Sequence, residues 1–177
     1  MMKEKGLVHI YTGEGKGKTT SAVGLAARAL GHNLKVCYVH FLKRPDLYGG
    51  NEIQSLEKLG ADILDFTGGH PSFNKSLTTN QLKEEVRKGL IYISGYVKTS
   101  PPDLLIMDEI LIAVRDGFLA EAELIDFIEQ KPPNMEIVLT GRNATDMLIE
   151  KADYVSYIQK IKHPFDRNIK SRKGIEY

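Results

Sequence analysis

The sequence predicts a single α/β domain, in which a mostly parallel sheet of about six strands carries helices on both faces. Short, nearly continuous apolar segments alternate with longer helical segments, which is the pattern of a doubly wound sheet covered on both sides. The 177 residues suffice for one full core and are too few for two domains of ordinary size. We therefore expect one domain over residues 1–177.

The expected strands are apolar runs at residues 7–11, 35–42, 62–66, 104–107, 136–140 and 154–161. The expected helices cover residues 18–30, 51–59, 80–97, 120–130 and 144–151. In the longest of them, apolar residues from Leu82 to Val97 recur at spacings of three and four and form one buried face. Proline pairs at 101–102 and 132–133 precede the fourth and fifth strands, where proline ends the preceding helix.

Composition and charge argue against several classes of protein. Hydrophobic residues make up 42% of the chain and charged residues 27%, which is typical of soluble globular proteins. The formal net charge of +1 gives no reason to expect nucleic acid or a membrane as a partner. No segment resembles a membrane span or a signal peptide, and the single cysteine, Cys37, is expected to be a small buried hydrophobe. We therefore expect a cytoplasmic protein.

A glycine-rich segment directly after the first strand, here called the glycine loop, predicts a phosphate-binding site. It reads Thr12-Gly13-Glu14-Gly15-Lys16-Gly17-Lys18-Thr19-Thr20. Small residues allow successive backbone N–H groups to point at one anion, and the following helix adds its positive N-terminus. Lys18 is expected to reach the outer phosphates, and the Thr19 hydroxyl to bind Mg²⁺. Thr12 stands where the general pattern has its first glycine, and the alternative is an ordinary glycine turn before a helix.

The apolar strand at residues 104–107 ends in two carboxylates, Asp108 and Glu109. Ligands collect at the carboxyl ends of parallel strands, so both side chains are expected to face the glycine loop. Mg²⁺ prefers oxygen ligands and retains waters, so one carboxylate, bound directly or through water, is sufficient. Alone, such a pair is more often a strand end that meets solvent. Together with the glycine loop it predicts a nucleotide site in a P-loop NTPase-like, RecA-like fold.

Two arginines complete the candidate nucleotide-binding set. Arg142 follows the strand at residues 136–140, where it either contacts an anionic ligand or is a surface arginine at the start of a helix. Arg28 lies about three turns along the first helix, where a surface salt bridge explains it as well. The five histidines lack metal-ligand spacing, so no zinc site is expected.

Several motifs together carry a resemblance to a known family. They are the glycine loop from Gly13 to Thr20, Ala26-Ala27-Arg28-Ala29 with Gly31-His32, Met107-Asp108-Glu109, Thr140-Gly141-Arg142, and the tail segments Lys162-His163-Pro164-Phe165-Asp166 and Gly174-Ile175-Glu176-Tyr177. With these motifs the chain resembles, nearly from end to end, the ATP:corrinoid adenosyltransferases of the CobA, CobO or BtuR type. The tail is the most specific part of the match.

The resemblance implies that a reduced Co(I) corrinoid attacks the 5′ carbon of ATP, and that intact triphosphate leaves. Lys18, Mg²⁺ and backbone N–H groups would stabilise that leaving group, with Thr19, Asp108 and Glu109 holding the metal. It also implies a homodimer and an electron-donating reductase as a partner. Members of the family often carry a Phe and a Trp that face the corrinoid. This chain has no Trp, and Phe73 or His70 is the candidate substitute.

Two other functions remain open at this stage. A small-metabolite kinase would use the same loop and a base such as Asp108 or Glu109, and it would release ADP instead of triphosphate. A regulatory P-loop ATPase of the partitioning type would place a second lysine five residues before Lys18, where this chain has Gly13.

The C-terminal tail is rich in basic residues: Lys160, Lys162, Arg167, Lys170, Arg172 and Lys173. A frayed terminus is the ordinary expectation for such a segment. Because the tail also carries apolar residues and follows a strand without a linker, we expect it to be ordered. It should pack across the carboxyl ends of the strands and close the nucleotide site.

Overall fold

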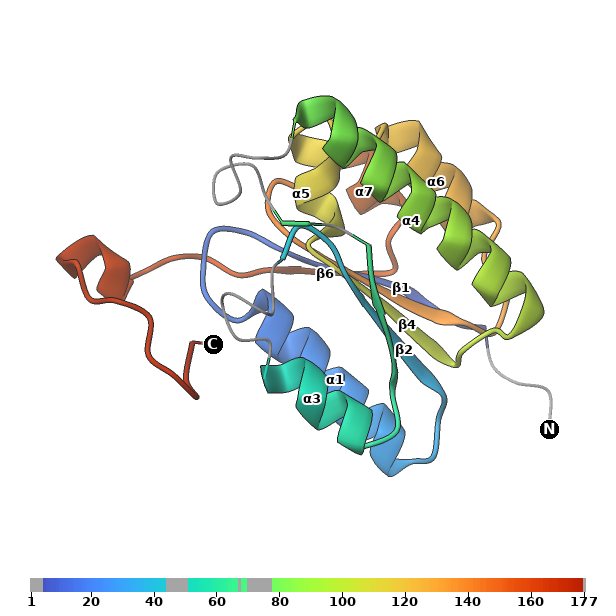
Figure 1. Ribbon diagram of the computed structural model, residues 1–177, viewed down its shortest axis with the longest axis horizontal. Helices are drawn as coiled ribbons and strands as arrows, with labels where there is room; N and C mark the ends of the chain where they lie inside the picture. Colours follow the sequence, from blue (N-terminus) through green and yellow to red (C-terminus); the bar gives the residue numbers. More distant parts are fainter. Residues whose placement is uncertain (1–4, 44–50, 67, 70–77, 177) are drawn as a thin grey trace.

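The computed structural model describes residues 5–43, 51–66, 68–69 and 78–176. Within them, all strands run parallel in one sheet of order β3-β2-β4-β5-β1-β6 (Figure 1). The strands are β1 (Val8–Thr12), β2 (Val36–His40), β3 (Asp62–Asp65), β4 (Leu104–Asp108), β5 (Glu136–Thr140) and β6 (Tyr154–Tyr157). All six expected strands are present, and the predicted doubly wound α/β fold is confirmed.

Helices cover both faces of the sheet. They are α1 (Lys18–Gly31), α3 (Asn51–Lys58), α4 (Thr79–Thr99), α5 (Ile110–Arg115), α6 (Glu121–Glu129) and α7 (Asp146–Lys151), followed by the 3₁₀ turn η1 (Pro164–Arg167). Helices α1 and α3 lie on one face, and α4, α5, α6 and α7 lie on the other (Figure 1). The sequence analysis missed α5 and η1, because elements of six and four residues are too short to show helical periodicity.

Each strand divides its side chains between two cores, as the alternation of a pleated strand requires. In β2, Val36 and Tyr38 pack on the α1 side, while Cys37 and Val39 face the α4 side. Small residues of α1, among them Ala22 and Ala26, are completely buried and allow that helix to lie close to the sheet. The interior position expected for Cys37 is confirmed, since its side chain is fully buried.

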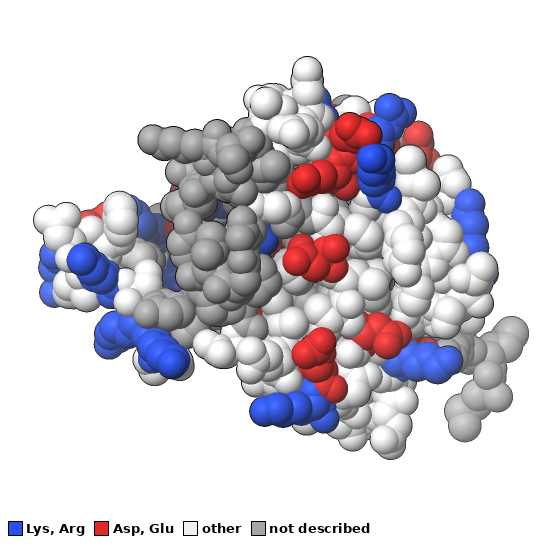
Figure 2. All heavy atoms as spheres, viewed as in Figure 1, with Lys and Arg blue, Asp and Glu red and all other residues white. Residues whose placement is uncertain are grey.

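Strand β6 is shorter than expected and is the exposed edge of the sheet. It ends at Tyr157 instead of residue 161, because the chain then turns to follow the glycine loop: the Ile158 N–H donates to the Thr12 carbonyl at 2.8 Å. All four β6 residues are exposed, and the chain beyond them leaves the body of the molecule as an arm (Figure 1). Figure 2 shows basic side chains gathered on this arm. In the part of the chain that is described, no helix has the length and apolarity to cross a bilayer.

Candidate active site

The glycine loop is shaped by contacts with the segment that follows β6. Gly13 and Gly17 adopt φ angles of 109° and 129°, which side chains disfavour. A Cβ on Gly15 would lie 2.6 Å from the Gln159 carbonyl oxygen, so only glycine fits there. The Gly15 N–H donates to the Ile158 carbonyl at 2.7 Å and ties the loop to this segment. The loop is therefore set in place by tertiary contacts as well as by its own glycines.

Thr12 has a structural use that explains why it replaces the first glycine of the general pattern. Its side chain is buried, and its hydroxyl accepts a hydrogen bond at 3.2 Å from the Ala144 N–H ahead of α7. The hydroxyl thereby links the start of the glycine loop to the loop that follows β5.

Lys18 begins α1 and turns its ammonium back toward the glycine loop. Its Nζ donates to the Gly15 carbonyl at 2.7 Å, and the residue is only 8% exposed. Burial lowers the pKa of Lys18, and the positive charge of Arg142 lowers it further. The N-cap residue, Gly17, makes no side-chain cap, so the first N–H groups of α1 are free of a capping side chain.

A cavity of about 660 Å³, here called the loop cavity, opens in front of the glycine loop. Its size is that of a small-molecule site. It is lined by the glycine loop from Glu14 to Thr20, Lys43, α3 residues Asn51, Glu52 and Ser55, the side chains Val23, Glu109 and Arg142, and tail residues His163, Ser171, Gly174, Ile175 and Glu176. The tail therefore borders the cavity, as expected. Its apolar side chains nevertheless stay exposed: Phe165 is 77% exposed and Ile175 61%.

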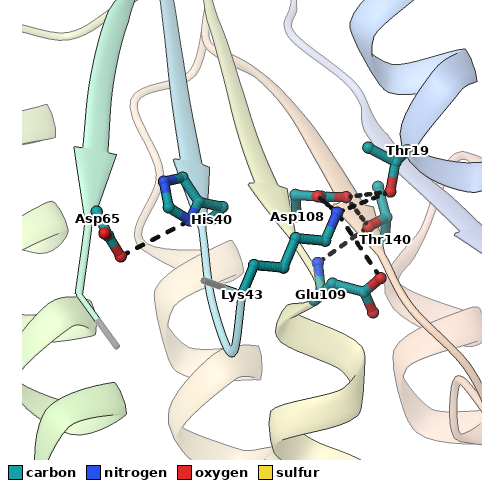
Figure 3. Close-up of polar contacts among 7 residues, drawn as sticks. All are labelled: Thr19, His40, Lys43, Asp65, Asp108, Glu109 and Thr140. Carbon is teal, nitrogen blue, oxygen red and sulfur yellow. Dashed lines mark hydrogen bonds and ion pairs between the residues drawn. The ribbon is translucent and has the colours of Figure 1, made fainter. Parts of the chain in front are cut away.

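Asp108 ends β4 directly behind this cavity and is completely buried (Figure 3). The Thr19 hydroxyl donates to its Oδ1 at 3.0 Å, and the Thr140 hydroxyl donates to the same oxygen. Burial by itself raises the pKa of Asp108, but the ammonium of Lys43 and the hydroxyls of Thr140 and Tyr38 outweigh burial and bring the pKa below its usual value. Asp108 is thus a buried carboxylate in its ionised form.

Glu109 follows in a conformation that few side chains adopt. Its φ is 65°, and its N–H donates to the Thr140 hydroxyl at 3.0 Å. Left-handed backbone at a non-glycine residue costs on the order of 1 kcal/mol and is most common at functional sites. Within the described residues its Oε2 is buried without a hydrogen-bond partner. Burial and the neighbouring Asp108 raise the pKa of Glu109.

The sequence analysis missed Lys43, which comes just after β2. Its ammonium forms an ion pair with Asp108, lies 3.2 Å from the Thr19 hydroxyl and 3.9 Å from Glu109 Oε1 (Figure 3). Burial lowers the pKa of Lys43, but the charges of Asp108 and Glu109 raise it by more. The signal was available: Lys43 directly follows an expected strand, at the same edge of the sheet as Asp108.

The oxygens of Thr19, Asp108 and Glu109 form a donor set of the kind that Mg²⁺ prefers. The unpaired Oε2 of Glu109 fits such an ion, because a buried oxygen without a donor is satisfied by a cation. Within residues 5–43, 51–66, 68–69 and 78–176, no group of three or more His, Cys, Asp and Glu side chains is placed to hold a metal. A metal here would therefore depend on the threonine hydroxyl, two carboxylates and the ligand itself.

The remaining candidate residues divide between the cavity and its surroundings. Arg142 lines the loop cavity and forms an ion pair across the glycine loop with Glu14. Arg28 lies in the last turn of α1, outside the residues that line the cavity, and its nucleotide-binding role stays a prediction. His70 and Phe73 lie outside the described residues.

The strand order, the glycine loop between β1 and α1, and the carboxylates after β4 together define an α/β protein of the P-loop-like class. The family model described as ATP:corrinoid adenosyltransferase BtuR/CobO/CobP matches residues 4–177. The chain belongs to this family.

Curated relatives agree with that assignment over nearly the whole chain. A corrinoid adenosyltransferase of Sinorhizobium sp. is 33% identical over 98% of this chain and 81% of its own length. The corrinoid adenosyltransferase of Escherichia coli K12 is 31% identical over 98% of this chain and 87% of its own. The corrinoid adenosyltransferase CobA of Salmonella typhimurium is 31% identical over 99% and 87%.

Proposed function

We propose that this protein transfers the 5′-deoxyadenosyl group of ATP to the Co(I) centre of a reduced corrinoid, in cobalamin biosynthesis or salvage. The cobalt electron pair forms the new cobalt–carbon bond, the C5′–O5′ bond breaks, and triphosphate leaves with the bonding electrons. The observation that carries the proposal is the convergence of Lys18, Thr19 and Glu109 on one cavity beside buried Asp108, in a chain of this family.

The glycine loop is proposed to hold the triphosphate. The uncapped start of α1, and the loop N–H groups other than that of Gly15, which donates to Ile158, are preorganised donors for an anion. Lys18 only needs to leave the Gly15 carbonyl to reach a phosphate oxygen, since its ammonium already lies at the loop. Negative charge grows on the triphosphate as the C–O bond breaks, so donors fixed beforehand stabilise the transition state more than the bound ATP.

Thr19, Asp108 and Glu109 are proposed to hold Mg²⁺ against the triphosphate. When bound, Mg²⁺ supplies positive charge to the leaving group. Thr140 positions both acidic residues, because its hydroxyl donates to Asp108 and accepts from the Glu109 N–H. This double contact explains why a strand end can hold two neighbouring carboxyl groups in defined orientations.

Two partners are inferred, an electron donor from the chemistry and a second copy of the chain from the β6 edge of the sheet. A Co(I) corrinoid must be generated by an electron donor, so we infer a separate reductase and a cytoplasmic setting. A homodimer is supported by β6, which within the described residues pairs only with β1 and exposes Tyr154, Val155 and Tyr157. Sedimentation of the wild-type chain should give a dimer mass, and Tyr157→Asp should give a folded monomer. A wild-type monomer at micromolar concentration would refute this part.

Product analysis tests the function directly. The protein is mixed with Mg·ATP and a chemically reduced corrinoid, and the products are separated by chromatography. Adenosylated corrinoid and triphosphate in equal amounts are the expected result. Release of ADP, or the absence of any adenosylated product, would overturn the proposal, and ADP would point to a kinase. An unreduced corrinoid is the control, because Co(I) is the required nucleophile.

A further inference from the structure

Lys43 occupies a position that the proposed function assigns to a metal ion. Its ammonium makes an ion pair with Asp108, lies 3.2 Å from the Thr19 hydroxyl and 3.9 Å from Glu109 (Figure 3). These are the same three side chains that are proposed to hold Mg²⁺. A lysine ammonium and Mg²⁺ at this point would repel each other across a few ångströms in a partly buried site. The two cations therefore compete for one place.

A cation is needed beside Asp108 whether or not nucleotide is bound. Asp108 is completely buried, and a buried carboxylate without a compensating charge is strongly unfavourable. Among the described residues, the other Lys and Arg side chains at the cavity have different partners: Lys18 donates to the Gly15 carbonyl, Arg142 is paired with Glu14, and Lys16 with Glu176. Lys43 is therefore the residue that neutralises Asp108 in the ligand-free chain.

Lys43 is also able to move away without leaving the site. Its side chain is 31% exposed, whereas that of Asp108 has no exposure at all. It lines the loop cavity together with the glycine loop, so an ammonium displaced from Asp108 remains beside the place proposed for the triphosphate. Lysine suits such a change, because its flexible stem carries a point charge with no fixed geometry.

We propose that Lys43 is an exchangeable counter-cation. It holds the acidic residues while no nucleotide is bound, yields the position to the metal that arrives with ATP, and then contacts the triphosphate. The inference rests on the proposed magnesium site. Its consequence is that free Mg²⁺ binds poorly to the empty protein, because a resident cation must first be displaced, whereas Mg·ATP offers Lys43 a new partner.

Metal binding without nucleotide tests the first half of this proposal. Mg²⁺ is titrated into wild-type protein and Lys43→Met in the absence of ATP, and binding is followed by calorimetry and by the melting temperature. In EDTA, Lys43→Met should melt at a lower temperature than wild type, and Mg²⁺ should restore its stability. Its dissociation constant for Mg²⁺ should be at least about tenfold lower than that of wild type. Equal Mg²⁺ affinity in the two proteins would overturn it.

Two further variants control for general effects. Lys151→Met removes an exposed lysine that pairs with Glu129, and it should leave Mg²⁺ binding at the wild-type level. The double variant Lys43→Met with Asp108→Asn removes both charges, so it should be more stable in EDTA than Lys43→Met and should not respond to Mg²⁺. A double variant that still gains stability from Mg²⁺ would show that the ion binds elsewhere and would overturn the proposal.

ATP binding at saturating Mg²⁺ tests the second half. There the metal neutralises the acidic residues in both proteins, and only wild type can supply Lys43 to the triphosphate, so wild type should bind ATP severalfold more tightly than Lys43→Met. Equal affinities would overturn the move of Lys43 onto the nucleotide. None of these measurements uses a corrinoid or turnover, so their outcome is distinct from a failure of the proposed adenosyl transfer, which product analysis of the wild-type protein reports.

Discussion

The glycine loop and the C-terminal arm border the same cavity, but they are built in opposite ways. Around the loop, Lys18 is 8% exposed and donates to the Gly15 carbonyl, and Asp108 is fully buried and accepts a hydrogen bond from the Thr19 hydroxyl of α1. Along the arm, Ile161 is 83% exposed and Phe165 77%. The comparison shows that the proposed nucleotide half of the site is supported by the core of this chain, whereas the arm carries apolar side chains that the described chain leaves exposed.

The two regions meet through a few polar contacts. The Gly15 N–H donates to the Ile158 carbonyl, and the Lys16 ammonium lies 3.5 Å from the Ile175 carbonyl and 3.6 Å from Glu176. Exposed ion pairs of this kind contribute about 0–1 kcal/mol each. The arm can therefore influence the cavity while adding little to the stability of the domain, and the predictions below test that division.

The largest effect is expected for Lys18→Ala, which removes the buried ammonium of the glycine loop. Loss of a preorganised cation should cost about 3 kcal/mol in transition-state stabilisation, or roughly 100-fold in turnover. The melting temperature should change little, since Lys18 begins a helix at the surface of the core. Turnover is measured with Mg·ATP and reduced corrinoid, with Lys151→Ala as the matched control. Near-normal turnover of Lys18→Ala would remove the phosphate-binding role from the loop.

Next in size are Asp108→Asn and Glu109→Gln, which alter the proposed metal ligands. Each should raise the Mg²⁺ concentration that gives half-maximal activity, by about tenfold for a lost charge–charge contact. The activity is titrated with Mg²⁺ at saturating ATP. If both variants keep the wild-type Mg²⁺ dependence, the two carboxyl groups serve another purpose.

Truncation after Lys162 tests the arm itself. Removal of the residues that line the cavity should weaken ATP binding severalfold, or about 1 kcal/mol, and reduce turnover, while the domain remains folded. Calorimetry gives the affinity, and circular dichroism with the melting curve reports the fold. Unchanged affinity and rate would show that the arm has no part in the site. Loss of folding would contradict the separation between core and arm.

The smallest effects are expected at the rim, where Glu14 and Arg142 form an ion pair that is half exposed. Arg142→Ala should change stability by less than about 1 kcal/mol, as is usual for a surface pair, and should weaken ATP binding a few fold. Glu14→Ala is the matched control: it breaks the same pair but leaves the arginine free for the nucleotide, so the affinity should hold or rise. Equal losses in both variants would mean that only their ion pair matters.

Much of this molecule could be predicted from patterns that act locally. Apolar runs located all six strands of the described sheet, and the glycine loop with Asp108 and Glu109 located the candidate site, because parallel strands bring their carboxyl ends to one edge. Three features could not be read in this way. Helix α5 and the turn η1 are too short for a periodic signal, and the end of β6 depends on where Ile158 meets the glycine loop.

The sequence by itself determined the fold class, the loop and the family, because each depends on residue types at fixed spacings along the chain. Only the tertiary structure decided which charges neutralise one another. Lys43 and Asp108 are 65 positions apart, and their ion pair exists because β2 and β4 are neighbours that end at the same edge of the sheet. Thr140 reaches Asp108 from β5 for the same reason. Electrostatic partners depend on distance in space, which no spacing along the chain records.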